Sequence, residues 1–316
     1  YSEICRFQFS MEKIKLAKKS YSEYNNLDII LNKIITEISS VVVSRLSPYS
    51  LILVGSLARG EAMVSLSSNG LIINSDIEMF VICSQKKKNN CNNLSSLFSK
   101  KYGVEIDLIP ESPSRFQSKD LTISNYDLKN NSIILFGRDY RPNLPKLASN
   151  KLPNWEGIRL IFNRISELMK DFNFTDSNEK LFNYHNYWIN KLVLASLDSI
   201  SILKGNYRTH FKNKIKKYYG YFDSFPVNTI TEDNFFRILQ NLEKSRLPNK
   251  VDKQSSNIIF WKEIKEMALA SFSLLVSHDL NIKNFNHFLN YNKYISHEKV
   301  LRNYSKGRFT NIIYQN

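Results

Sequence analysis

The sequence predicts an α+β fold, in which a mixed β-sheet with flanking helices is followed by an all-α helical bundle. Strand signals, which are short β-branched runs closed by glycine or a polar turn, occur only before about residue 140. From residue 154 onward, apolar residues recur at helical spacing. Between these parts, the segment 141–154 contains three prolines and indicates a linker. We therefore expect two domains, residues 1–145 and residues 146–316.

The expected first domain begins with a helix over residues 27–46, where apolar side chains recur every three or four positions until "SPYS" interrupts them. The run "LILV" at 51–54 predicts a buried strand that ends at Gly55. The next stretch, "SLARGEAMVSL", predicts a short helix, and "SSNG" predicts a loop. Residues 71–82 predict either one long strand or two strands in tandem.

Two more strands complete the expected sheet. A helix at 94–103 leads into the strand 104–110, and the run 132–138 predicts a last strand that carries Gly137. Strands and helices are therefore mixed in this half, which indicates an α/β or α+β domain. After the linker, five periodic apolar segments predict the helices of the bundle, at 155–172, 179–205, 232–245, 257–279 and 281–295. Gly205 is expected to cap the second of them.

The chain is strongly basic. Lysine and arginine number 44 against 29 for aspartate and glutamate, which gives a net charge of +15. This balance fits either an ordinary basic surface or an anionic partner such as a nucleotide, nucleic acid, phosphorylated sugar or acidic lipid head group. The stretch "HFKNKIKKYYGYF" at 210–222 interleaves basic and aromatic residues. Such a stretch suits RNA binding or a helix with a basic, solvated face.

Several protein classes are disfavoured. The three cysteines are odd in number and lack metal-site spacing, which argues against a disulfide framework and favours a reduced cytosolic setting. No apolar run approaches the roughly 20 residues of a membrane-spanning helix, and no signal peptide is visible. We therefore expect a cytoplasmic protein with no membrane span. Zinc-type histidine spacing and the glycine-rich Walker and dinucleotide patterns are absent.

Two acids, Asp76 and Glu78, interrupt the apolar run 71–82. Residues i and i+2 of a strand point to the same face, so the two carboxylates are expected to project together and repel each other. No lysine or arginine lies within three residues of the pair. A divalent metal such as Mg²⁺, which takes oxygen ligands, would resolve the repulsion. The alternative is an edge strand whose outer face is merely polar.

Two further features stand near this pair in the predicted sheet. Gly55 and Ser56 form the turn after the strand 51–54, where glycine lets the backbone approach a ligand and free N–H groups suit a phosphate. An ordinary strand-to-helix turn is the alternative. Asp107 lies in "VEIDLIP" and would supply a third carboxylate if its strand lies beside that of Glu78. Glu105 is the rival third acid on the same face.

The combination of Gly55-Ser56, Asp76-x-Glu78 and a later Asp107 resembles the pattern of the nucleotidyltransferase superfamily, which includes polymerase β, the kanamycin-type enzymes and small prokaryotic members. The resemblance covers roughly residues 27–140, and the helical half is similar to the partner domain of bacterial and archaeal members. One difference is that 19 residues, 57–75, separate Ser56 from Asp76, about twice the usual spacing. The excess, "MVSLSSNGLII", predicts an inserted hairpin.

The resemblance implies a role for each matching residue. Gly55 and Ser56 would hold the triphosphate of a nucleoside triphosphate such as ATP. Asp76 and Glu78 would bind Mg²⁺ or Mn²⁺, and Asp107 would bind a second metal ion and help to deprotonate the acceptor hydroxyl. The reaction would be in-line attack on the α-phosphate with release of pyrophosphate.

Two cationic residues and the acceptor are less defined. Arg59 suits either the phosphate side of the site or a solvated surface. Lys191 either snorkels from its helix or reaches the triphosphate, as a lysine of the helical domain does in relatives. We expect a small-molecule or sugar-type acceptor. The alternatives are transfer to RNA, tRNA or a protein side chain, as in toxin-type relatives, and a catalytically silent nucleotide-binding module.

Overall fold

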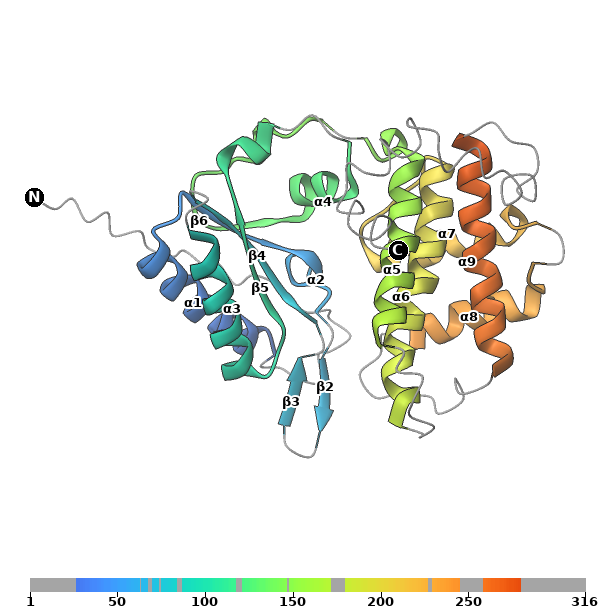
Figure 1. Ribbon diagram of the computed structural model, residues 1–316, viewed down its shortest axis with the longest axis horizontal. Coiled ribbons are helices and arrows are strands. Elements are labelled where there is room, and N and C mark those ends of the chain that lie inside the picture. The colour runs from blue at the N-terminus through green and yellow to red at the C-terminus, as the bar shows by residue number, and fades with distance from the viewer. Residues whose placement is uncertain are drawn as a thin grey trace, which may run out of the picture. The chain divides into compact units, whose positions relative to one another are not determined.

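Figure 1 shows the computed structural model of the chain, which divides into two compact units, Tyr1–Lys146 and Leu147–Asn316. The division falls inside the proline-containing segment expected to be the linker. The structure describes residues 27–62, 64–67, 70–73, 75–83, 87–117, 121–146, 148–171, 180–226, 229–244 and 258–279. The helix expected at 281–295 lies outside these residues.

The first unit is built around one mixed sheet. Strands β5, β4, β1 and β6 lie side by side in this order, with β1 antiparallel to both of its neighbours and β4 parallel to β5. Short 3₁₀ helices occur at Pro113–Gln117 and Arg141–Asn143. The elements run along the chain as α1 (Leu27–Leu46), β1 (Ser50–Val54), α2 (Gly55–Ala58), β2 (Val64–Ser67), β3 (Gly70–Ile73), β4 (Ile77–Ile82), α3 (Lys88–Tyr102), β5 (Ile106–Glu111), α4 (Ile123–Asn131) and β6 (Ile133–Gly137).

Both faces of this sheet are covered. Helices α1 and α3 lie on one face, where their apolar residues pack against Leu51 and Leu53 of β1 (Figure 1). The intervening Ile52 points to the other face and joins a smaller core with Leu128 of α4 and Phe116. A strand that is buried on both faces is apolar at every position, which explains the uninterrupted run of β1.

Two of the predicted elements in this unit need correction. The helix expected in "SLARGEAMVSL" is only the four-residue α2, because Gly60 takes a left-handed φ of +67° and β2 begins at Val64. The helix expected at 94–103 begins earlier, at Lys88, because its polar first turns still bury Cys91 against the core. The helix over 27–46 is confirmed.

The segment 71–82 contains two strands that belong to different sheets. Strand β3 pairs with β2 in a separate antiparallel hairpin, whose register sets Ser67 opposite Gly70. Strand β4 belongs to the main sheet. The inserted hairpin predicted between Ser56 and Asp76 is therefore confirmed, and it lies outside the main sheet.

The second unit is helical throughout its described residues. It contains α5 (Asn154–Asp171), α6 (Lys180–Leu203), α7 (Phe211–Tyr218), α8 (Glu232–Lys244) and α9 (Ile258–Asp279), with 3₁₀ helices at Ser149–Lys151 and Tyr219–Ser224. Helices α5, α6 and α9 pack against one another (Figure 1). Gly205 follows α6 with a φ of +63°, as expected for a cap. Over the described part of the chain, no helix combines the length and apolarity needed to cross a membrane.

Candidate functional site

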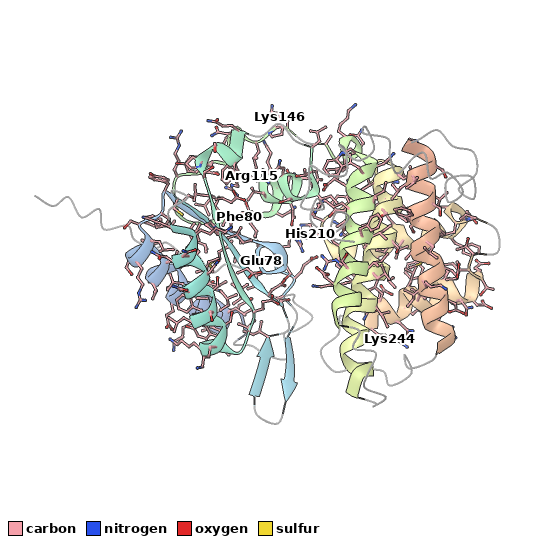
Figure 2. The ribbon with its side chains drawn as sticks, in the orientation of Figure 1. Glu78, Phe80, Arg115, Lys146, His210 and Lys244 are labelled. Atoms are coloured by element: carbon pink, nitrogen blue, oxygen red, sulfur yellow. The ribbon has the colours of Figure 1, made fainter. Side chains whose placement is uncertain are left out.

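Three carboxylates gather at one end of the main sheet. The parallel register of β4 and β5 sets Glu78 directly opposite Asp107, so the two side chains share a face. Asp76 immediately precedes β4. The sequence predicted this group on the condition that the two strands were neighbours, and the register meets that condition. Figure 2 labels Glu78 on β4, close to the short helix α2.

The pKa values of Glu78 and Asp107 are raised at this site. Burial raises the pKa of Glu78 to about 7, and the negative charges of Asp76 and Asp107 add to this effect. Burial also raises the pKa of Asp107, again with a contribution from Asp76. The positive charge of Arg59 acts in the opposite direction on Glu78. The carboxylates therefore lie close enough to repel one another, and a cation bound among them would relieve that repulsion.

None of the three carboxylates forms an ion pair or a hydrogen bond within the described residues. The nearby Arg59 bonds to other acids instead: its Nε donates to Glu61 Oε2 at 3.2 Å, and its Nη1 donates to Asp127 Oδ2 at 2.6 Å. Arg59 thus links the end of α2 to α4. Its charge still lowers the pKa of Glu78, but its hydrogen bonds hold it against Glu61 and Asp127.

The Gly55–Ser56 turn brings β1 and α2 against the acids. Gly55 has a left-handed φ of +73°, and a Cβ at this position would overlap Glu78 Oε2. Glycine is therefore needed both for the backbone and for the room that the Glu78 carboxylate takes. The sequence predicted that Gly55 lets the backbone approach a ligand, whereas in the structure the Glu78 carboxylate occupies this space.

Ser56 carries a buried Oγ with no hydrogen-bond partner among the described residues. Buried hydroxyl groups are nearly always bonded, so an unbonded one at the edge of a charged group is unusual. The residue is held in place by its neighbour Leu57, which is completely buried in the core of the sheet unit. The Ser56 hydroxyl thus has an unused hydrogen-bonding capacity within the described residues.

The structure also places the other residues that the sequence singled out. Asp107 stands at the position paired with Glu78, and its charge acts on Glu78. The rival acid Glu105 precedes β5, where its backbone carbonyl accepts a bond from Ile77 N–H at 2.8 Å. Lys191 is half-buried in α6, in the helical unit.

Sequence reasoning missed Asp127. This α4 residue accepts the bond from Arg59 and contributes to the raised pKa of Glu78. Its Oδ1 also accepts a bond from Asn131 Nδ2 at 2.9 Å. In the sequence Asp127 resembles any acid on the polar side of a helix, so no local signal distinguishes it.

The residues at this site are of the types that bind a magnesium ion, but their side chains are not grouped closely enough to hold one without a further ligand. Within the described residues, no three or more histidine, cysteine, aspartate or glutamate side chains are grouped so that they could hold a metal ion. Mg²⁺ is nevertheless commonly held by one or two carboxylates together with phosphate oxygens of a substrate. Mutually repelling carboxylates beside an unbonded hydroxyl suit such shared coordination.

The structure adds to the pattern the paired register of Glu78 and Asp107, the left-handed Gly55 and the unbonded Ser56 hydroxyl. The resemblance to the nucleotidyltransferase superfamily rests on the sequence pattern of Gly55-Ser56, Asp76-x-Glu78 and Asp107 alone. Comparison of the chain with protein-family models, with curated proteins and with solved structures finds no match.

Proposed function

We propose that the chain is a metal-dependent nucleotidyltransferase, which transfers a nucleoside monophosphate from a nucleoside triphosphate to a hydroxyl group and releases pyrophosphate. The observation that carries this proposal is the group of Asp76, Glu78 and Asp107, which has no ion pair within the described residues. A partly buried carboxylate such as Glu78 is normally paired or hydrogen-bonded when it has only a structural role. Repelling acids without such partners indicate a site that receives a cation.

Each residue of the group has a distinct part in the proposed reaction. Asp76 and Glu78 supply oxygen ligands for Mg²⁺, and Gly55 leaves the room that the Glu78 carboxylate occupies. The Ser56 hydroxyl donates to a phosphate oxygen of the triphosphate. Bound Mg²⁺ would supply neutralisation of the phosphate charge.

Asp107 is the proposed proton acceptor. Its side chain is exposed, unlike that of Glu78, and so is open to an acceptor molecule. Its raised pKa makes it a stronger base than an ordinary aspartate. The acceptor oxygen forms a bond to the α-phosphorus, the bond from that phosphorus to the bridging oxygen breaks, and pyrophosphate leaves. The hydroxyl proton passes to Asp107.

The topology of the main sheet supports the proposal in spite of the long spacing before Asp76. Val54, the last residue of β1, pairs directly with Glu78, so the turn at Gly55 and the acids remain adjacent. The extra residues are absorbed by the hairpin β2–β3, which forms its own two-stranded sheet. The insertion therefore lengthens the chain between the two parts of the motif without separating them in space.

Nucleotide binding provides the first test. We expect calorimetry to show that at least one of ATP, CTP, GTP and UTP binds the wild type in Mg²⁺ and loses its affinity in EDTA. The Asp76→Asn variant should lose the metal-dependent binding, whereas the matched variant Glu105→Gln should keep it. Binding that persists in EDTA or in Asp76→Asn, or no binding by the folded wild type, would contradict the proposal.

Pyrophosphate release tests the catalytic step. Asp107→Asn is expected to bind the same nucleotide with its metal but to lower turnover by about 10²–10⁴-fold, the usual range for losing a general base. The Glu105→Gln variant should turn over normally. Tight metal-dependent binding without turnover on any hydroxyl acceptor would instead identify a silent nucleotide-binding module.

A further inference from the structure

A concentrated basic surface lies on the helical unit. The stretch 204–217 contains six lysine and arginine residues and no acid. It runs from the end of α6 through α7, whose start is marked by His210 in Figure 2. One of the six cations, Lys214, is bonded to Asp198. The other five form what we call the basic surface: Lys204, Arg208, Lys212, Lys216 and Lys217.

The fold of α7 directs this charge outward. Its apolar residues Phe211, Ile215 and Tyr218 are buried in the core of the helical unit. Lys212 and Lys216, spaced i and i+4, are both exposed and therefore lie together on the outer side of the helix. Their positions are about 6 Å apart along the helix axis, so the surface offers repeated charges rather than a single point.

The five cations of the basic surface have no acidic partners within the described residues. None of the five forms an ion pair within the described residues. Four other cations of the described part of this unit are paired with acids, in the pairs Arg159–Glu156, Arg164–Glu167, Arg237–Glu263 and Lys265–Glu266. Within the described residues, the basic surface is therefore a run of five cations that no acid neutralises.

The residues beneath the basic surface hold it in place. Lys214 Nζ bonds to Asp198 Oδ2 at 2.6 Å and lies 4.9 Å from the centre of the Tyr207 ring. Lys204 lies over the ring of Tyr221 at 5.2 Å. These contacts fix α7 and the segment before it, so a ligand would meet a surface that needs little further ordering.

We propose that the basic surface binds a nucleic-acid strand through its phosphates. Several cations spread over α7 and the preceding loop match a chain of repeated negative charges better than one small anion. A membrane surface fits poorly, because a helix that lies on lipid must expose apolar residues, and those of α7 are buried in the protein core. The net charge of +15 would favour the encounter with such a strand.

This binding is independent of the proposed chemistry, but its use in catalysis rests on the proposed nucleotidyl transfer. If both hold, the acceptor is a hydroxyl group of a nucleic acid rather than of a small molecule. Because strand binding needs neither nucleotide nor metal, it can be measured in EDTA without a triphosphate. The Asp76→Asn variant should then bind the strand like the wild type, so failure of one proposal is distinguishable from failure of the other.

The test uses fluorescence anisotropy with labelled RNA and DNA single strands of about 20 nucleotides and identical sequence. We expect the double variant Lys212→Gln/Lys216→Gln to weaken binding about 10- to 25-fold near 0.1 M salt and to reduce the slope of log K against log salt by about 1.4. The matched control Arg237→Gln/Lys265→Gln removes two exposed charges from paired sites in the same unit. It should change affinity less than about twofold.

The results of this test distinguish nucleic-acid binding from a general effect of net charge and from lipid binding. A preference for RNA over DNA, or equal binding of both, supports the proposal and identifies whether the sugar hydroxyl is read. Equal weakening by the two double variants would overturn it, because the effect would then follow net charge. So would wild-type affinity in Lys212→Gln/Lys216→Gln with an unchanged melting temperature. Binding of anionic phosphatidylserine vesicles without binding of either strand would assign the surface to lipid.

Discussion

The two halves of the chain surround a carboxylate with opposite partners. In the helical unit, Asp198 is 6% exposed and accepts bonds from Lys214 Nζ at 2.6 Å and from the Tyr218 hydroxyl at 2.7 Å. Burial and the charge of Asp198 raise the pKa of Tyr218, so its hydroxyl keeps the proton that it donates. In the sheet unit, Glu78 faces two other acids, and its pKa rises to about 7.

Under the proposed function, this difference separates an acid that stabilises the fold, Asp198, from one that binds a ligand, Glu78. Asp198 has a cation and a hydroxyl as partners, as a buried charge needs if it is not to destabilise the protein. Glu78 and its neighbours repel one another, which lowers the stability of the folded state. Such unfavourable arrangements are typically retained where function requires them, because a bound ligand offsets their cost.

The largest expected effect is on the Asp198 side of this comparison. Asp198→Ala removes the partner of Lys214 and leaves a largely buried ammonium group without a counter-charge. We expect the free energy of unfolding to fall by about 3–5 kcal/mol, the usual cost of removing one member of a buried pair. Urea unfolding followed by circular dichroism measures it.

A double variant provides the control. Asp198→Leu/Lys214→Met removes both charges and should cost much less than Asp198→Ala, because no unpaired charge remains. If Asp198→Ala cost less than about 1 kcal/mol, the pair would be no more than a surface ion pair, and the contrast with Glu78 would fail.

In the metal-free protein, Glu78→Gln is expected to raise the free energy of unfolding, whereas Asp198→Ala lowers it. Glu78 ionises with a pKa of about 7 in the folded state, above the ordinary 4.5, so the folded state holds its proton more tightly than the unfolded state. Stability therefore falls as pH rises from about 4.5 to 7, and the loss is complete above pH 7. We expect Glu78→Gln to be more stable than the wild type by about 2 kcal/mol at pH 8. This is less than the full pKa shift corresponds to, because solvent screens the charge of a half-buried side chain.

Unfolding in EDTA across this pH range checks the prediction. The two proteins should be equally stable near pH 4, where Glu78 is protonated in both states, and should diverge as the pH rises. Added Mg²⁺ should narrow the difference, because a ligand that binds only the folded wild type stabilises it. A wild type that gains stability over Glu78→Gln between pH 5 and pH 8 in EDTA would show that Glu78 is favourably paired.

Local sequence patterns predicted part of the site. The two-residue spacing of Asp76 and Glu78 predicted a shared face, and the apolar run around Asp107 predicted its strand. These features depend only on neighbours along the chain. The register that sets Glu78 opposite Asp107 depends on the order of strands in the sheet. The sequence did not determine this order, so the prediction held only if the two strands were neighbours.

Contacts between distant segments were not predictable in this way. Arg59 bonds to Asp127, 68 residues further along the chain, because α4 packs near α2. The close approach of Glu78 to Gly55 likewise follows from the pairing of β4 with β1. Strand and helix periodicity identify which face is buried, but the partner on that face is decided by packing across the fold.

The smallest expected effect on stability concerns the two buried hydroxyls of the comparison. The Tyr218 hydroxyl donates to Asp198, whereas Ser56 Oγ has no partner within the described residues. Ser56→Ala therefore removes no hydrogen bond, and it should leave the free energy of unfolding within about 0.5 kcal/mol of the wild type or raise it slightly. The same variant should weaken binding of the Mg²⁺–nucleotide complex about tenfold, as expected when a donor to a charged phosphate is lost. Stability and affinity that fell together would mean that Ser56 serves the fold, whereas unchanged stability with weakened affinity would place its hydroxyl, with Glu78, on the side of the ligand.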